Sequence, residues 1–256
     1  MLSEDRLRGI VAEVRRRGSA SVSRLSVDFA VSEATIRRDL DQLAESGTLR
    51  RVRGGATAIR GSVRPEADPR PFADVATAAS SAKAGIAARA ATLVEDGSVV
   101  ALDIGTSVAA LCPQLRDREL TVVTASLAVV QALADAPGID LVVLGGLLRP
   151  SYQSMVGTLT ESALRQVRVD VAFLGAAGVR PDGCVLDSTP SEVPVKRGLL
   201  DIAGRSYLLV DHEKFPGTGF LEIAPATRFA GIVTDRPLPP GAIDLPEGEE
   251  LEVLLP

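Results

Sequence analysis

Residues 31–47 read VSEATIRRDLDQLAESG, which combines the start, the apolar stripe and the end of one helix. Ser32 is a residue type that favours the N-cap, and Gly47 is the type that most often follows a helix. Three apolar residues at i, i+4 and i+7 form a single stripe, namely Ile36, Leu40 and Leu43. The pattern therefore predicts a helix from Ser32 to Ser46 that packs this stripe against a core.

Two more helices are predicted before this one, and a hairpin after it. Apolar spacing predicts a helix over 7–14 and a short helix over 21–29, the latter ending only two or three residues before the third helix. After Gly47, residues 48–58 contain three arginines and two short strand-like pieces around Gly54-Gly55. Three helices followed by a basic hairpin predict a winged helix-turn-helix.

The outer face of the third helix carries the residues that we expect to contact nucleic acid. With Ile36 facing the core and successive residues turned by about 100°, Arg38 points outward near the helix start, where recognition helices contact base edges and phosphates. We predict DNA-binding roles for eight residues: Ser32, Ala34, Thr35, Arg37, Arg38, Arg50, Arg51 and Arg53. In the alternative reading, Arg37 pairs with Asp41 and the arginines only solvate the surface.

The charge of the chain is distributed unevenly. Residues 1–60 carry 12 Arg and 8 Asp or Glu, a net charge of +4, whereas residues 61–256 carry −9, so the total is −5. A basic module on an acidic body is typical of polyanion binding, although a solvated charged face gives the same asymmetry. Phe29 is the single aromatic residue of the basic module, which disfavours base stacking with single strands and favours duplex DNA.

The rest of the chain divides into a linker and a larger domain. Residues 59–79 contain three prolines among scattered charges, which indicates a linker between a headpiece at 1–58 and a second domain at 80–256. From residue 80, helical patterns alternate with strands that are apolar on both faces, which predicts an α/β domain with a parallel sheet covered on both sides. The strands are expected at 98–102, 120–123, 139–144, 170–174, 207–210 and 231–234, with an edge strand at 251–255.

Small and polar residues follow several of these strands. The first strand leads into Asp103-Ile104-Gly105-Thr106-Ser107, where backbone N–H groups and hydroxyls suit a phosphate, although capping of the next helix explains the turn equally well. Ligands gather at the carboxyl ends of parallel strands, so the other strand ends are also candidates. These are Thr124 with Ser126, Gly145-Gly146 and Gly175-Ala176-Ala177-Gly178.

Lysine is scarce and confined to the acidic body. Only Lys83, Lys196 and Lys214 are lysine among 28 basic residues, which suggests a need for a compact ammonium group, whereas ordinary surface roles remain the alternative. Lys214 follows a buried strand in the context Asp211-His212-Glu213-Lys214, which favours a site.

Composition excludes several other classes of protein. The longest stretch without charge, 120–134, contains polar residues and is too short to span a bilayer comfortably. The acidic start lacks the features of a secretory signal, so we expect a cytoplasmic protein. Two cysteines and one histidine cannot supply a disulfide framework or a zinc site, and we predict no metal and no cofactor.

The headpiece carries a motif of a known family. Val31-Ser32-Glu33-Ala34-Thr35-Ile36-Arg37-Arg38-Asp39-Leu40, followed by Gly47 and Arg51-Val52-Arg53-Gly54-Gly55-Ala56, resembles the DNA-binding signature of the DeoR family of bacterial transcriptional regulators. A histidine usually precedes the Gly-Gly of that family. Arg53 takes its place here, which keeps phosphate contact possible.

The second domain resembles the sensor domain of the same family, a relative of the sugar-phosphate isomerase and CoA-transferase type of α/β fold. The matching pieces are Lys83 with Ile86-Ala87, Asp103 to Thr106, Thr124 with Ser126, Leu144-Gly145-Gly146, Gly157, Glu192 with Lys196-Arg197, and Asp211 with Lys214-Phe215. The resemblance implies that a phosphorylated sugar or related metabolite binds the sensor and changes DNA affinity. Ala125 stands where an asparagine is usual, which implies one fewer ligand hydrogen bond and an atypical effector.

The sequence thus predicts a DNA-binding regulator that acts on double-stranded operators as a homo-oligomer without membrane attachment, and the resemblance implies that it is a repressor. We expect eleven effector-binding residues: Asp103, Gly105, Thr106, Ser107, Thr124, Ser126, Gly145, Gly146, Lys196, Asp211 and Lys214. The alternative is an isomerase- or deaminase-like enzyme with an appended nucleic-acid-binding module. We predict no catalytic residue, because the acidic segment associated with pentose-phosphate isomerases is not found and a plain enzyme would leave the basic headpiece unexplained.

Overall fold

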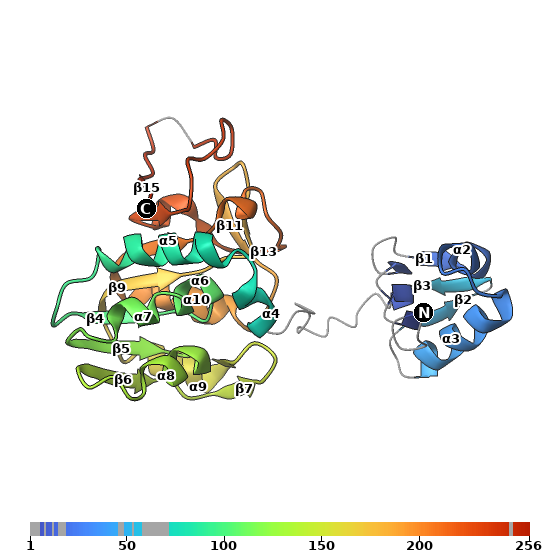
Figure 1. The fold of residues 1–256 in the computed structure, drawn as a ribbon, viewed down its shortest axis with the longest axis horizontal. Helices are drawn as coiled ribbons and strands as arrows, with labels where there is room; N and C mark the ends of the chain where they lie inside the picture. The colour runs from blue at the N-terminus through green and yellow to red at the C-terminus, as the bar shows by residue number, and fades with distance from the viewer. Residues whose placement is uncertain are drawn as a thin grey trace. The chain divides into compact units, whose positions relative to one another are not determined.

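The computed structural model describes residues 6–7, 9–11, 13–14, 19–45, 49–52, 54–57, 72–245 and 248–256. The chain forms two compact units, Met1–Arg64 and Pro65–Pro256, and Figure 1 labels their elements. In these described parts, no helix is long and apolar enough to cross a membrane.

The first unit contains helices packed beside a small antiparallel sheet. The described residues of 6–14 are helical, and they precede α2 (Val22–Asp28) and α3 (Glu33–Glu45). The strands β1 (Ser19–Ser21), β2 (Arg50–Val52) and β3 (Gly55–Thr57) pair in the order β1-β3-β2. One apolar cluster joins the helices to β1 and β3, and it contains Ile10, Val14, Ala20, Val22, Leu25, Ile36, Leu40, Leu43, Leu49 and Ala56. This arrangement is the predicted winged helix-turn-helix.

The hairpin differs from the prediction at its glycines. Gly54 lies in the turn with φ +83°, but Gly55 is the first residue of β3. A Cβ at Gly55 would lie 2.2 Å from the carbonyl oxygen of Ala20 on β1. A glycine is therefore required at position 55, because β1 approaches β3 closely there. Strand β1 was not predicted from the sequence. Gly47 lies outside the described residues.

The second unit is built on a seven-stranded parallel sheet with the order β15-β14-β12-β9-β4-β5-β6. All the strands expected from the sequence are present, including the edge strand at the C-terminus. Their bounds are β4 (Val99–Leu102), β5 (Leu120–Thr124), β6 (Ile139–Val143), β9 (Val169–Leu174), β12 (Ala203–Leu209), β14 (Gly231–Val233) and β15 (Val253–Leu254).

Helices cover both faces of this sheet, as predicted. One apolar cluster contains side chains of four helices on one face: α5 (Ser80–Ala91), α6 (Thr106–Ala109), α7 (Cys112–Leu115) and α8 (Leu127–Leu133). A second cluster lies on the other face with α9 (Thr158–Leu164) and α10 (Val193–Ile202). The edge strand β6 is an exception, because Val142 and Val143 are 39% and 44% exposed.

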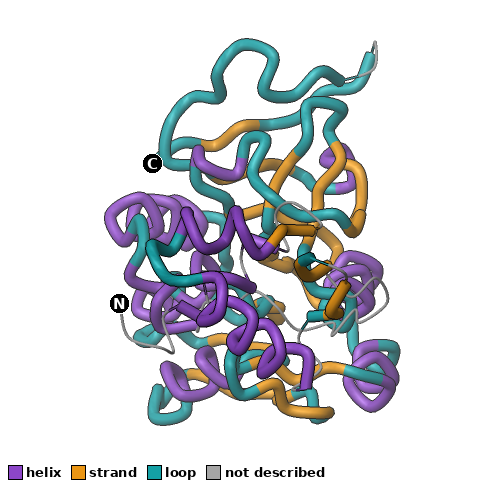
Figure 2. The backbone as a smooth tube through the Cα atoms, turned by 90° about the vertical axis from the view of Figure 1, so that its right-hand side faces the viewer, coloured by secondary structure: helices purple, strands orange, loops and turns teal. Residues whose placement is uncertain are grey.

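Shorter elements complete the second unit. The hairpin β7 (Leu147–Arg149) and β8 (Ser154–Val156) follows β6. A separate antiparallel sheet contains β10 (Gly178–Val179), β11 (Cys184–Asp187) and β13 (Leu221–Pro225), and two 3-10 turns lie at His212–Lys214 and Ala226–Arg228. Residues 235–245 and 248–252 form a long loop before β15 (Figure 2).

Part of the predicted linker belongs to the second unit. Helix α4 (Phe72–Thr77) lies within the stretch 59–79 that the sequence analysis assigned to a linker. The N–H of Phe72 donates to the carbonyl oxygen of Ser151 at 3.0 Å, and the Phe72 ring meets the Tyr152 ring edge to face at 5.9 Å. These tertiary contacts stabilise a helix too short to be recognised from its own sequence. Residues 59–71 lie outside the described part of the chain.

Candidate functional site

The start of α3 presents small and basic side chains at the surface of the first unit. The hydroxyl of Ser32 accepts a hydrogen bond from the Thr35 N–H at 3.2 Å, as an N-cap residue does. Ala34, Arg37 and Arg38 are exposed, and Thr35 is half-buried. The first turn of this helix is therefore open to a ligand that accepts hydrogen bonds.

The two arginines of this helix differ in their contacts. Arg37 donates to the carboxylate of Glu33 at 2.7 Å, rather than to Asp41 as the alternative reading expected. Arg38 makes no hydrogen bond or ion pair with any other residue that the structure describes. Its guanidinium is thus the more available of the two for a phosphate or a base edge.

Arg51 has a structural contact in the wing. Its Nε donates to Asp41 at 2.7 Å and its Nη1 donates to the carbonyl oxygen of Gly55 at 2.6 Å, so it ties α3 to the hairpin. For Arg50 only the backbone, in β2, is described, and the predicted residue Arg53 lies outside the described residues. The helix start therefore carries five of the eight predicted DNA-binding residues in one place.

Asp39 is a further structural residue of α3 that the sequence analysis did not single out. Both of its carboxylate oxygens accept from Arg6, at 2.7 and 3.1 Å, and both side chains are largely buried. Asp39 lies about 60° from Ile36 around the helix, which places it on the inward side. The position of Asp39 on the inward side of the predicted helix could have identified it as a buried carboxylate in need of a partner.

The second unit has a cavity of about 120 Å³ at the carboxyl ends of the central strands. The chain continues from β4 to β5 and β6 on one side of the sheet and from β9 to β12 and β14 on the other side, so the topology reverses between the paired strands β4 and β9. Open α/β sheets bind ligands at such switch points. Gly105 after β4 and Gly175 after β9 both line the cavity, as does Asp211 after β12.

Donor groups and carboxylates both line this cavity. Hydroxyls come from Thr106 and Ser107 at the start of α6, and ammonium groups come from Lys83, Lys196 and Lys214. Asp187 and Glu192 supply carboxylates. Because phosphate needs donors and sugar hydroxyls pair well with carboxylates, the lining has the chemistry for a phosphorylated polyol.

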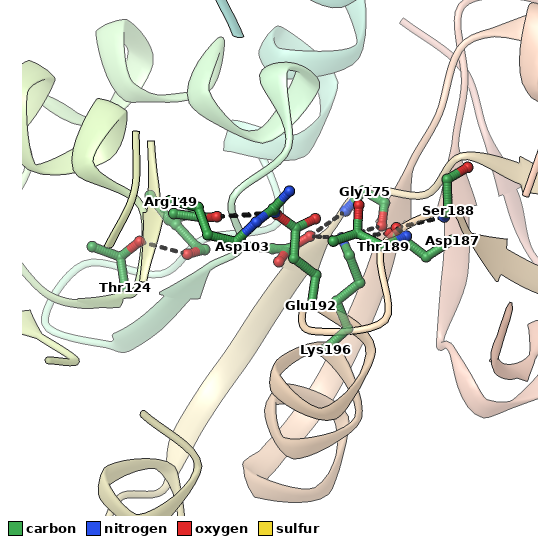
Figure 3. A network of polar contacts seen from close by, with 11 residues as sticks. Asp103, Thr124, Arg149, Gly175, Asp187, Ser188, Thr189, Glu192 and Lys196 are labelled. Atoms are coloured by element: carbon green, nitrogen blue, oxygen red, sulfur yellow. Dashed lines mark hydrogen bonds and ion pairs between the residues drawn. The ribbon is translucent and has the colours of Figure 1, made fainter. Parts of the chain in front are cut away.

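A buried network of ion pairs supports the floor of the cavity (Figure 3). The Lys196 ammonium contacts the carboxylate of Asp103, lies 3.6 Å from Asp187 and donates to the Gly175 carbonyl oxygen at 2.9 Å. Asp103 also accepts from the Gly175 N–H at 3.0 Å. This set fixes α10 against the ends of β4 and β9.

A second pair lies beside the first. Arg149 of β7 contacts the carboxylate of Glu192, and the Ser154 hydroxyl donates to the same oxygen at 3.0 Å. Burial raises the pKa of Glu192 to about 7, although the charges of Lys196 and Arg149 act in the opposite direction. Burial alone would lower the pKa of Lys196, but the surrounding carboxylates outweigh it and raise that pKa.

The structure sorts the predicted effector residues into two groups. Six line the cavity, namely Gly105, Thr106, Ser107, Lys196, Asp211 and Lys214, and Asp103 lies behind Lys196. Thr124 and Ser126 are fully buried and do not line it: Thr124 donates to the Leu102 carbonyl oxygen at 2.7 Å, and Ser126 caps α8. Their side chains satisfy local backbone groups instead.

Gly145 and Gly146 also lie away from the cavity. The Gly145 carbonyl oxygen accepts from the Thr160 hydroxyl at 2.8 Å. A Cβ at Gly146 would lie 2.1 Å from that hydroxyl oxygen, so this glycine is explained by packing against α9. His212, the single histidine, is held by Asp235, with 2.9 Å between Nδ1 and Oδ2.

The sequence matches two family descriptions that together cover both units. Residues 6–61 match the DeoR-like helix-turn-helix domain, and residues 78–236 match the DeoR C terminal sensor domain. The chain belongs to the DeoR family of transcriptional regulators.

Characterised DeoR-family relatives share about a third of the sequence over most of the chain. The glycerol-3-phosphate regulon repressor of Escherichia coli K12 is 31% identical over 93% of both chains. The transcriptional repressor AccR of Agrobacterium fabrum is 33% identical over 91% of this chain and 90% of its own. The L-fucose operon activator of Haemophilus influenzae is 30% identical over 90% of this chain and 91% of its own.

Ribose 5-phosphate isomerase A of Methanocaldococcus jannaschii matches with a TM-score of 0.39 and 21% identity, over 52% of each chain.

Some cavity residues of this DeoR-family sensor were not among the predicted effector residues. Val75 of α4, Ala78 just after α4 and Tyr152 in the turn of the β7–β8 hairpin line the cavity, and neither α4 nor this hairpin was predicted from the sequence. Ser188 and Thr189 also line it, and their N–H groups donate to Asp187 at 2.7 and 2.9 Å. An aspartate followed by two hydroxyl residues and a proline is the signal of such a turn.

Proposed function

We propose that this DeoR-family protein is a repressor whose affinity for a duplex operator is set by a phosphorylated sugar, or a related metabolite, in the cavity of the second unit. The observation that carries the proposal is the cavity itself, in which hydroxyl and ammonium groups lie close to two buried carboxylates. The named relatives support it, since one of them is a repressor of a glycerol-3-phosphate regulon.

The DNA-binding role falls on the start of α3. Ser32, Ala34, Thr35, Arg37 and Arg38 occupy its first turns, and the exposed Arg38 would contact a base edge or a phosphate. Arg50 and Arg53 of the wing are proposed to contact the neighbouring phosphates. Arg51 contributes by holding the wing against Asp41.

The effector-binding role falls on residues that line the cavity. We assign phosphate contacts to Thr106, Ser107 and Lys214, and contacts with sugar hydroxyls to Asp187. A volume of about 120 Å³ favours a small metabolite over a dinucleotide. Gly105 and Asp211 complete the wall.

The buried network is assigned a supporting role rather than a catalytic one. The Lys196 ammonium contacts Asp103 and donates to the Gly175 carbonyl oxygen, and one carboxylate oxygen of Glu192 accepts from Arg149 and Ser154. A general acid or base must reach its substrate with a transferable proton, and these groups are committed to one another. The named relatives are regulators, which agrees with this assignment.

Association into a homo-oligomer is part of the proposal. Two headpieces would read two half-sites about one helical turn apart or a multiple of it. The outer edge of β6 pairs with no other strand of the described sheet, and Val142, Val143, Leu147 and Leu148 are exposed beside it. Such an apolar edge supports pairing between copies, which sedimentation of the wild type and of Val142→Lys would test.

Selection of duplexes from a random pool tests the function directly. We expect the full-length protein to enrich one sequence class and to lose affinity for it when a bound sugar phosphate is added. Calorimetry with a panel that includes glycerol 3-phosphate and glucose 6-phosphate identifies the compound. Enrichment of no duplex at low salt would remove the DNA-binding role, and turnover of a panel compound would favour the enzyme instead.

A further inference from the structure

Helix α4 is anchored at both ends by a few defined contacts. At its start, Phe72 is 9% exposed, bonds Ser151 through its N–H and packs its ring on Tyr152. At its end, the Lys83 ammonium donates to the carbonyl oxygens of Val75 and Ala78, the latter at 2.6 Å. One side chain from α5 therefore holds the C-terminal end of α4.

The groups that hold α4 also form part of the cavity wall. Val75, Ala78, Lys83 and Tyr152 all line the cavity. In addition, α4 packs against α6, whose first residues Thr106 and Ser107 also line the cavity. Figure 1 shows α4 beside α6 and the start of α5. A ligand in the cavity would touch the contacts on which the position of α4 depends.

The chemistry of Lys83 makes it sensitive to an anion. An ammonium group has three protons to donate, and hydrogen bonds from it to phosphate oxygens are stronger than those to neutral carbonyls. A phosphate within reach would compete for the protons that now bind Val75 and Ala78. Ala79, between α4 and α5, has φ +51°, a left-handed conformation that a non-glycine residue adopts only when its surroundings hold it.

Helix α4 is the first described element of the second unit, and 14 residues separate it in the sequence from β3, the last described strand of the DNA-binding unit. We propose that α4 couples the cavity to the DNA-binding unit, and that an anionic ligand acts by drawing Lys83 away from Val75 and Ala78 and so releasing α4. The inference deepens the proposed function and depends on it for the identity of the ligand. The proposed coupling between α4 and the DNA-binding unit does not require a bound ligand, so variants can test it in the ligand-free protein.

The test compares Lys83→Met and Phe72→Ala in the full-length protein, without ligand. Hydrogen–deuterium exchange of residues 72–79 measures the docking of α4, and binding to the duplex selected by the wild type measures the coupling. Arg228→Met removes the same charge as Lys83→Met from an exposed pair with Asp201 elsewhere in the unit, and it serves as the matched control. Circular dichroism confirms that each variant is folded.

We expect faster exchange at 72–79 in both α4 variants and a shift of operator affinity of roughly 5- to 150-fold in the same direction, with neither change in Arg228→Met. Faster exchange with unchanged operator affinity overturns the coupling. Unchanged exchange in Lys83→Met overturns the role of Lys83.

Repeating the exchange experiment with a ligand separates this inference from the proposed function. Glycerol 3-phosphate or glucose 6-phosphate, whichever binds in calorimetry, should speed exchange at 72–79 in the wild type and add little in Lys83→Met. If neither compound nor any other member of the panel binds, the proposed function fails, and the ligand-free comparison still decides whether α4 is coupled to DNA binding.

Discussion

The ammonium of Lys196 and the carboxylate of Asp103 form an ion pair beneath the cavity in which the two side chains are only 3% and 0% exposed. The pair joins α10 to the end of β4, and Asp187 lies 3.6 Å from the same ammonium. Removal of one partner would leave an unpaired charge in a buried site, which is far more costly than the net gain from forming the pair.

Lys196→Met should therefore destabilise the second unit by roughly 3–5 kcal/mol. Asp103→Asn should lower the free energy of unfolding much less in the Lys196→Met variant than in the wild type, because the pair is already broken. Urea unfolding followed by tyrosine fluorescence measures this, because the chain has no tryptophan and both tyrosines, Tyr152 and Tyr207, lie in the second unit. Strict additivity of the two changes would show that the pair is not coupled.

The two arginines of the headpiece should give different phenotypes. Arg38→Ala should reduce affinity for the selected duplex by about 1–3 kcal/mol without loss of fold, since Arg38 has no partner among the described residues. Arg51→Ala should mainly lower the stability of the headpiece, because it removes the contacts with Asp41 and the Gly55 carbonyl oxygen. Binding at matched salt and thermal unfolding separate the two effects, and full affinity in Arg38→Ala would exclude its recognition role.

Glu192 should make stability depend on pH. Burial raises its pKa in the folded state to about 7 from a usual value of 4.5, so the folded state holds this proton more tightly than the unfolded chain does. The free energy of unfolding should therefore fall as pH rises from about 4.5 to 7, by an amount on the order of 3 kcal/mol.

Glu192→Gln should flatten this dependence, whereas Glu213→Gln, an exposed neighbour at the cavity, should keep it. Urea midpoints at pH 5.5 and pH 8 make the comparison. A wild-type slope that survives in Glu192→Gln would assign the dependence to another group.

The two threonines at strand ends should also behave differently. Thr106→Val should weaken binding of a sugar phosphate by about 10-fold or more, since it removes a donor from the cavity wall. Thr124→Val should leave binding unchanged and lower stability by about 1–3 kcal/mol, because it leaves the buried Leu102 carbonyl oxygen without this donor. Calorimetry measures the ligand affinity of both variants, and urea unfolding measures their stability. If Thr124→Val weakened ligand binding and Thr106→Val did not, the cavity would not be the binding site.

The parts predicted best from the sequence are those in which local pattern and tertiary burial agree. The stripe of Ile36, Leu40 and Leu43 predicts α3, and the apolar runs predict all seven strands of the parallel sheet. Strand order then brings Thr106 and Lys214 to one cavity, although 108 positions separate them along the chain.

The parts that the sequence did not predict depend on contacts between distant segments. Helix α4 has six residues and is stabilised by Lys83 and Tyr152 rather than by its own composition. Thr124 and Gly146 have the residue types of a ligand site, but their neighbours in space, Leu102 and Thr160, determine that they serve packing and backbone hydrogen bonding. Type and position along the chain do not distinguish these cases.

The division between the cavity wall and the ion pairs below it has a consequence for how such sensors diversify. Much of the wall is made of loop ends and the short helix α4, whereas the ion pair between Lys196, which reaches the cavity, and Asp103 behind it fixes α10 to the end of β4. Under the proposed function, substitutions in the loop ends and α4 would change the preferred metabolite while the ion pair keeps the scaffold stable, so a few replacements would be enough for a new specificity.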